Sequence, residues 1–303
     1  MRALFKPFLL SIIGVSAVQI NTALDSLFAY FASEEGPAYL WYSSRIYQLP
    51  LALFGIALSS ALLPSLARAF KQESIDQFQG MLRFALSRAY QWIFPCMIAC
   101  VVGGCVSVNL LYGRGDFSPF ATKETVLCLW GYAFGLIPTA FVLLFAQAFY
   151  AKHEFRIPMV GALLSVLLNT ILNALMVFVF QWGSFSIAIA TSLSALFNCL
   201  YLARRLTKKI APIFDRGLLF SFGKTTLSSL IAGVGTMAMG YFFVQDPTFS
   251  LVCGSADIVF VRSFWDQLSQ FAALFLVFSL LFLSYGWMVR DPAIMTLLRK
   301  KNL

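Results

Sequence analysis

The stretch WYSSRIYQLPLALFGIALSSALLPSLAR, residues 41–68, places one arginine beside a long apolar run. A bilayer core of about 30 Å needs about 20 mostly apolar residues in a helix, and this run supplies them. Arg45 therefore either snorkels to a nearby interface or faces a cavity and holds an anion. Pro50 predicts irregular backbone one turn further on, which membranes tolerate where the backbone lines protein or water.

The composition extends this picture to the whole chain. The 303 residues are 60% hydrophobic and 12% charged, against about 25% charged residues in soluble domains. We therefore expect an all-α, polytopic membrane protein, since helices satisfy every backbone polar group in lipid. About eight segments are long enough to cross, at 8–32, 38–67, 89–111, 123–151, 157–181, 184–205, 217–244 and 265–289.

The distribution of charge predicts the orientation of the chain. With the N-terminus inside, most of the 22 Lys and Arg fall in inner connections, and only Arg114, Lys123 and Arg262 fall in outer ones. Both termini are then cytoplasmic. The net charge of +9 is explained by this asymmetry, and no nucleic-acid partner is expected. The inner set is Arg2, Lys6, Arg68, Lys71, Arg83, Arg88, Lys152, Arg156, Arg204, Arg205, Lys208, Lys209, Arg216, Lys224, Arg290, Arg299, Lys300 and Lys301.

Two units are expected along the chain. Residues 1–206 form a six-helix transmembrane lobe, and residues 207–303 contain a basic connector and a final transmembrane helix pair. Within the first unit, about residues 70–88 have apolar side chains at helical spacing and charges on the opposite face. This pattern is typical of an amphipathic helix lying along the cytoplasmic interface.

Asp25 and Arg45 are the two ionisable residues that stand out inside spans, where charge is costly and often functional. Each lies roughly 10 Å below the outer end of its helix at 1.5 Å per residue. Arg45 has Trp41 one turn above it for a cation–π contact, which suits snorkelling. Tyr42 and Gln48 share its face, which suits a cavity lining instead. A direct Asp25–Arg45 ion pair is a third possibility, because the two depths match.

Amide and hydroxyl side chains lie at the level of Asp25 in two later spans. Asn169 and Asn173 are four residues apart and face one way, while the sixth span carries Thr191 and Asn198. Counted from their outer ends, Asn173 and Thr191 lie near the level of Asp25, and the three residues form either an oxygen cage for a small cation or an interhelical hydrogen-bond cluster. The spacing alone favours the cluster.

The residue pattern indicates no conventional catalysis. The sequence has no paired-carboxylate site, Ser/His/Asp set, phosphate-binding loop or metal-ligand cluster, and we expect a transporter rather than an enzyme. Most of the six cysteines lie in apolar segments, where free Cys behaves as a small hydrophobe. No cofactor is expected beyond a candidate monovalent cation such as Na⁺.

Several stretches together resemble one family, the MurJ/MviN lipid II flippases of the MOP exporter group. The matching stretches are GVSAVQINTALDSLFAYF (14–31), the opening block (41–68), LLYGRGDFS (110–118), QAFYAKHEFRIPM (147–159) and NTILNAL (169–175). Their order and spacing look like the C-terminal lobe of that family. The resemblance implies a multi-pass protein of the bacterial cytoplasmic membrane, used in peptidoglycan biosynthesis.

What the resemblance implies for function is specific. An undecaprenyl-pyrophosphate-linked precursor would pass from the inner to the outer leaflet by alternating access between two lobes. Arg45, with Tyr42 and Gln48 on its face, would contact the headgroup, and the last two helices would form a groove for the lipid tail. The polar set of spans one, five and six would hold a monovalent cation. That set comprises Asp25, Asn169, Asn173 and Thr191.

The sequence also departs from the family pattern. Ser44 stands where relatives often have an acid immediately before the arginine, and Ala38 stands where they have a serine. The chain begins where a second lobe would begin, so a missing N-terminal lobe is expected, from the same gene or a separate chain. The alternatives are a flippase for another polyprenyl-linked glycan, a MOP-type antiporter, or a non-transporting scaffold of cell-wall synthesis.

Overall fold

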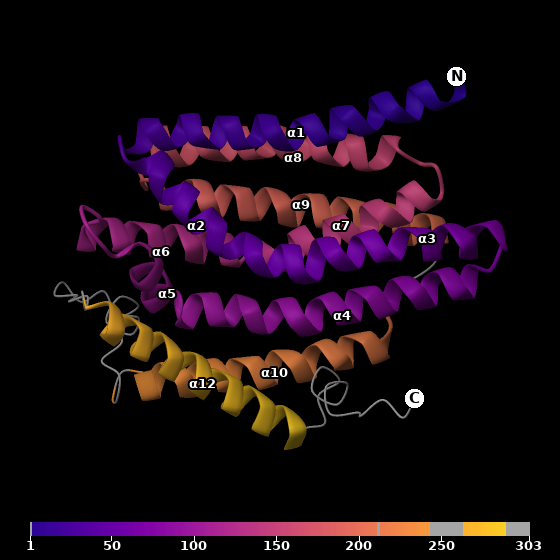
Figure 1. Cartoon of the computed structure of the whole chain (residues 1–303). Helices are drawn as coiled ribbons and strands as arrows, with labels where there is room; N and C mark the ends of the chain where they lie inside the picture. The colour runs from indigo at the N-terminus through magenta and orange to yellow at the C-terminus, as the bar shows by residue number, and fades with distance from the viewer. Residues whose placement is uncertain (1, 211–212, 241, 243–262, 289–303) are drawn as a thin grey trace.

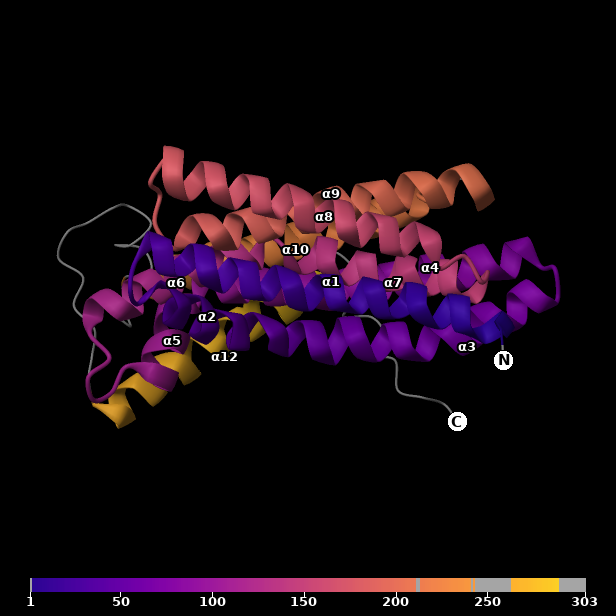
Figure 2. The ribbon, with the colours of Figure 1, turned by 90° about the horizontal axis from the view of Figure 1, so that it is seen from above.

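The computed structural model describes residues 2–210, 213–240, 242 and 263–288, with side chains from Gly14 onward except those of Val15 and Ile210. Every regular element in these ranges is a helix, and the helices run roughly along one common direction (Figures 1 and 2). Their bounds are α1 Arg2–Ala32, α2 Gly36–Pro50, η1 Leu51–Ile56, α3 Ala57–Lys71, α4 Ile75–Val102, α5 Gly104–Tyr112, α6 Pro119–Ala133, α7 Leu136–Ala151, α8 Arg156–Ala174, η2 Leu175–Val179, α9 Phe185–Ile210, α10 Arg216–Met239 and α12 Phe264–Met288.

The described helices match a polytopic membrane protein. Six of them are long and apolar enough to cross a membrane, and α6 with α7 makes a seventh if that pair, bent by 42°, is one span. The expected span 8–32 falls on α1, which is not counted among these seven. The predicted number of about eight is therefore approximate. The ends of spans 217–244 and 265–289 lie outside the described residues, as do Arg262, Arg290, Arg299, Lys300 and Lys301.

The quoted stretch forms one continuous rod, α2–η1–α3, from Gly36 to Lys71. Pro50 is the last residue of α2, and the π-helical segment η1 follows it directly, as the expectation of irregular backbone required. The bend between α6 and α7 comes just before Pro138. Pro95, in contrast, lies inside α4, which continues through it from Ile75 to Val102.

The main hydrophobic core surrounds α7. Phe145 and Phe149 of α7 are fully buried against Leu66 of α3, Leu86 of α4 and Leu206 of α9. Removing such side chains from water stabilises by about 1.5–3 kcal/mol each, and in a bilayer the same close packing holds the helices together through dispersion. The core therefore fixes α3, α4 and α9 around one central helix, and α1 and α8 pack side by side beyond α9 (Figure 1).

The expected interfacial helix at about residues 70–88 is wrong. Residues 75–88 form the first half of α4, which continues without a break into the membrane-spanning part. The apolar face is where the spacing placed it, but Phe78, Leu82 and Ala85 are buried in the protein core rather than in lipid. An amphipathic pattern reports only that one face is apolar, and a protein neighbour satisfies it as well as a membrane surface does.

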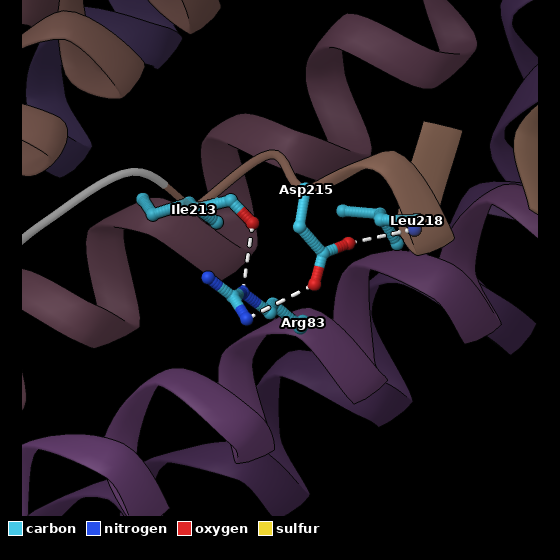
Figure 3. A network of polar contacts seen from close by, with 4 residues as sticks. All are labelled: Arg83, Ile213, Asp215 and Leu218. Atoms are coloured by element: carbon cyan, nitrogen blue, oxygen red, sulfur yellow. Dashed lines mark hydrogen bonds and ion pairs between the residues drawn. The ribbon is translucent and has the colours of Figure 1, made fainter. Parts of the chain in front are cut away.

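The final helix pair packs on the far side of α4 (Figure 1), where α10 contacts α4 and α12 contacts α10 and α5. Figure 3 shows how the connector before α10 is held. Asp215 caps the helix by accepting a hydrogen bond from the Leu218 backbone N–H at 2.7 Å. Arg83 of α4 donates to the Ile213 carbonyl oxygen at 2.9 Å and pairs with Asp215 at 3.0 Å. One arginine thus ties the connector to the six-helix unit.

Candidate functional site

Asp25 of α1 lies at the centre of a buried polar cluster and is only 6% exposed. Its Oδ1 accepts hydrogen bonds from Nδ2 of Asn169 at 2.6 Å and Nδ2 of Asn173 at 2.7 Å. Its Oδ2 accepts from Thr191 Oγ1 at 3.0 Å. The structure therefore brings together all four residues that sequence analysis selected as cation-binding candidates, from α1, α8 and α9.

Asn21 is a further member of this cluster. Its Nδ2 donates to Asp25 Oδ2 at 3.1 Å, and its Oδ1 accepts from Asn169 Nδ2 at 2.8 Å. The signal for it was its position one helical turn before Asp25, on the same face of α1. Sequence reasoning noted that position without assigning Asn21 to the site.

The donor set suits a small monovalent cation. One carboxylate supplies a single negative charge, and two amides and a hydroxyl supply neutral oxygens, the hard ligands such ions prefer. The Oδ1 atoms of Asn169 and Asn173 are buried and accept no hydrogen bond within the described residues. A turn of each amide about its last side-chain torsion exchanges its nitrogen and oxygen, so both oxygens are available to an ion beside Asp25.

A cavity of about 590 Å³ opens beside this cluster. Asp25 is the only charged residue among the described residues that line it, so the cavity is negative rather than positive. Its walls come from α1, α2, η1, α6, α7, α8 and α9, and they include Asn21, Gln48, Tyr132, Ser165, Thr191 and Asn198. Such a cavity favours a cation and disfavours a pyrophosphate group.

The third possibility for these residues, an ion pair between Asp25 and Arg45, is not present among the described residues. Both carboxylate oxygens of Asp25 accept from the neutral amide and hydroxyl donors described above. Arg45 instead lies on the exposed face of α2, with its guanidinium carbon 4.7 Å from the centroid of the Trp41 ring. The equal depth expected from residue counting therefore did not lead to contact between the two side chains.

The three headgroup candidates have different neighbours. Gln48 lines the negative cavity. Trp41, whose ring makes the cation–π contact with Arg45, lines it too. Tyr42 turns toward the α5 end of the molecule, where its ring packs on Tyr112 at 4.6 Å between centroids. Arg45 therefore lies at the edge of the cavity on Trp41, whose ring also contacts Tyr42 at 5.3 Å between centroids, and no described carboxylate pairs with it.

A second, apolar groove of about 440 Å³ runs between α2, α4, α5 and α12. Leu53 and Leu110 form part of its wall, together with Phe271 and Phe275 of α12. Cys96 and Cys100 also line it as free cysteines, in agreement with their expected role as small hydrophobes. The groove has the shape and chemistry to hold a hydrocarbon chain.

Comparison with known proteins gives a consistent result. A family model described as "Lipid II flippase MurJ" matches residues 1–255. A probable lipid II flippase MurJ of Chlamydia muridarum is 30% identical over 245 residues, which is 80% of this chain and 45% of that protein. Its counterpart in Helicobacter pylori strain J99 is 36% identical over 201 residues, 65% of this chain and 42% of that protein.

Solved structures support the fold. A lipid II flippase MurJ in an inward closed conformation superposes with a TM-score of 0.69 at 24% identity, covering 95% of this chain and 53% of that one. A MATE transporter superposes with a TM-score of 0.59 at 15% identity, covering 95% and 66%. These likenesses show that the described helices share the fold of these two transporters.

The chain spans about half the length of the curated relatives it matches. The expectation of a missing N-terminal lobe is not supported by these comparisons. They match residues 1–255 of this chain to the family and align relatives to most of it. The family match covers most of the chain, including both the Asp25 cluster and Arg45. This multi-pass membrane protein belongs to the MurJ family of lipid II flippases.

Proposed function

We propose that this chain takes part in moving an undecaprenyl-pyrophosphate-linked peptidoglycan precursor, lipid II, from the inner to the outer leaflet. The proposal rests on family membership over residues 1–255 and on the membrane-spanning helices. The activity is transport by alternating access, in which no bond is made or broken. It assigns to this chain a headgroup contact, a groove for the lipid tail and a cation site.

Arg45 is the observation that carries the headgroup contact. It is a permanent cation in a membrane-spanning helix, exposed on the surface of the chain and without a paired carboxylate in the described residues. A guanidinium group presents parallel N–H donors that match phosphate oxygens. The negative cavity excludes the pyrophosphate from the side of Asp25, so the headgroup lies on the exposed side of α2.

The apolar groove between α2, α4, α5 and α12 supports a place for the lipid tail. It passes Leu49 and Pro50, within two turns of Arg45, so one substrate molecule reaches both features. Its described lining is almost entirely apolar, as an isoprenoid chain requires. The tail then lies between the six-helix unit and the final helix pair.

The membrane is the bacterial cytoplasmic membrane, with both termini on the cytoplasmic side. The charge distribution supports this orientation: Arg68 and Lys71 end α3, Lys152 follows α7, and Lys208 and Lys209 lie in the last turn of α9. These positions share one side of the membrane, and the positive-inside rule assigns that side to the cytoplasm.

The Asp25 cluster binds one monovalent cation, for which Na⁺ is the probe. Asp25, Asn169, Asn173 and Thr191 hold it, and Asn21 is within reach. The bound ion supplies one positive charge that neutralises Asp25, and the three helices α1, α8 and α9 are thereby drawn to one point. Na⁺-dependent thermal stability of the wild type and of Asp25→Asn tests this site.

Growth tests the headgroup contact. The variants Arg45→Ala and Arg45→Lys are placed at the gene's own locus, with Arg204→Ala as a control for loss of an exposed arginine at the end of α9. We expect Arg45→Ala to stop growth and to leave lipid II in the inner leaflet, and Arg204→Ala to grow normally. Arg45→Lys keeps the charge but loses bidentate geometry, so we expect partial growth.

The Arg45–Trp41 contact also favours an alternative, a non-transporting scaffold in which Arg45 only snorkels along apolar surface. In that case Arg45→Ala leaves both growth and the leaflet distribution of lipid II unchanged at normal protein levels. That result would reject the headgroup role of Arg45.

A further inference from the structure

The negative cavity continues along α9 well beyond the Asp25 cluster. Thr191, Ser194 and Asn198 all line it, at helix positions i, i+3 and i+7 that share one face. From Thr191 to Asn198 the rise is about 10 Å at 1.5 Å per residue. Ser165 of α8 faces this track and donates a hydrogen bond from Oγ to the Ser194 carbonyl oxygen at 3.0 Å. A polar path therefore leads from Asp25 along the seam between α8 and α9.

Asn198 ends this path as a buried amide with an unsatisfied oxygen. The residue is 9% exposed, and its Oδ1 accepts no hydrogen bond within the described residues. Leaving such an atom buried and unpaired costs about 1–3 kcal/mol. A turn of the amide toward the cavity would relieve this cost, because it would bring the oxygen to water or to a cation there.

Gly161 of α8 keeps the space around Asn198 open. A β-carbon at this glycine would lie 2.6 Å from Asn198 Oδ1 and 3.1 Å from the Tyr201 ring. Both values are below ordinary contact, so any larger residue would displace the amide. Ala162 and Ala195 also line this part of the cavity with small side chains. The packing of α8 on α9 thus preserves room beside an amide whose oxygen accepts no hydrogen bond from the described residues.

We propose that the cavity from Asp25 to Asn198 is the route by which the cation reaches and leaves the Asp25 cluster, with Asn198 as a second, transient ligand. This inference rests on the proposed cation site. The wall charge supports it, because Asp25 is the only charged side chain in the described lining and attracts cations along the whole path. A turn of the Asn198 amide presents its oxygen to the passing ion.

A ligand on the route affects rates rather than the final affinity. Stabilising the ion midway lowers the barrier for entry and for exit equally, while the free energy of the ion at Asp25 stays the same. Replacing Asn198 by Leu, of similar volume, should therefore slow association and dissociation together by about tenfold, the effect of losing one contact to a charge. The equilibrium Kd should change little.

The test uses the purified full chain in lipid nanodiscs, mixed rapidly with NaCl or choline chloride. Tryptophan fluorescence follows binding, because Trp41 lines the cavity, and thermal stability at increasing Na⁺ gives Kd. Gln147→Leu is the matched control, since Gln147 also has a buried, unpaired amide oxygen but lies outside the cavity. Asn198→Asp keeps the shape and adds charge, so it should speed association.

The outcomes separate the two proposals. Slower exchange in Asn198→Leu, with wild-type rates in Gln147→Leu, supports the route. Wild-type rates in Asn198→Leu together with loss of the Na⁺ response in Asp25→Asn overturn the route and leave the cation site standing. Complete loss of equilibrium binding in Asn198→Leu, with normal stability in choline, also overturns the route by making Asn198 part of the primary site. A wild type that does not respond to Na⁺ overturns both.

Discussion

The replacement Asp25→Asn should remove the effect of Na⁺ on the stability of the chain. The carboxylate is the only charge among the described residues of the cavity, and its neighbours there are neutral amides and hydroxyls. At 4 Å and an effective dielectric constant of about 20, one unit charge attracts another by about 4 kcal/mol. Asparagine keeps the shape but loses this attraction, which weakens Na⁺ binding by about a thousandfold.

The size of the effect follows from linkage. At a Na⁺ concentration of about 100 times Kd, binding adds about 2.7 kcal/mol to the free energy of unfolding. For a chain of this size that corresponds to a rise in Tm of about 4 °C. The variant should show almost no rise over the same range. The measured quantity is the difference in Tm between sodium and choline, so a change in the ion-free stability of the variant does not affect it.

Thermal unfolding in detergent, followed by cysteine-reactive dye or by circular dichroism, gives this difference at several NaCl concentrations. Thr170→Val is the control, because Thr170 lies on α8 beside Asn169 but bonds only to the Val166 carbonyl among the described contacts. We expect it to keep the full sodium effect. An equal rise in Asp25→Asn and the wild type would refute the assignment of the cation to Asp25.

Two further predictions concern the packing of the helices. Asp215→Ala should cost about 1–2 kcal/mol because it removes the helix cap of α10, whereas Asp215→Asn keeps a capping side chain and should lose less than about 1 kcal/mol. The ion pair with Arg83 is 31% and 46% exposed, so a double-mutant cycle with Arg83→Met should give a coupling of only about 0.2–1 kcal/mol; additivity would contradict the contact. Gly131→Ala should destabilise by about 1–3 kcal/mol, because its β-carbon would lie 2.8 Å from Ala188. Gly80→Ala, with nothing within 4 Å, should instead stabilise α4 by about 0.5–1 kcal/mol, and equal effects at the two glycines would contradict the packing; denaturant unfolding measures both.

The Asp25 cluster was predictable because helix geometry converts residue number into depth. Asn169 and Asn173 share a face by spacing, and counting from the span ends put Thr191 at the level of Asp25. Both rules depend only on the rise and turn of the α-helix. The distances that join these residues confirm that the faces meet.

The direction of Arg45 and the position of residues 75–88 were not predictable in the same way. Depth fixes one coordinate of a side chain, while its neighbour depends on how helices are arranged around one another. Arg45 was therefore expected at the depth of Asp25, yet the two form no ion pair among the described residues. In residues 75–88 the apolar face was correctly located, but the sequence does not state whether protein or lipid covers it. In the structure it is covered by the protein core around Phe149. The space beside the Asn198 amide depends likewise on Gly161, which is distant in sequence.

The π-helical segment Leu51–Ile56 sets the angle about the rod axis between the side chains of α2 and those of α3. Below it, Leu62 and Leu66 are locked in the core, and above it α2 carries Arg45 and Trp41 on an exposed face. A π-helical turn holds an extra residue, and its return to α-helical bonding turns everything beyond it by about 100° per residue. Deleting one residue from Leu51–Ile56 would therefore turn Arg45 by about 100° about the rod axis relative to the buried Leu62 and Leu66.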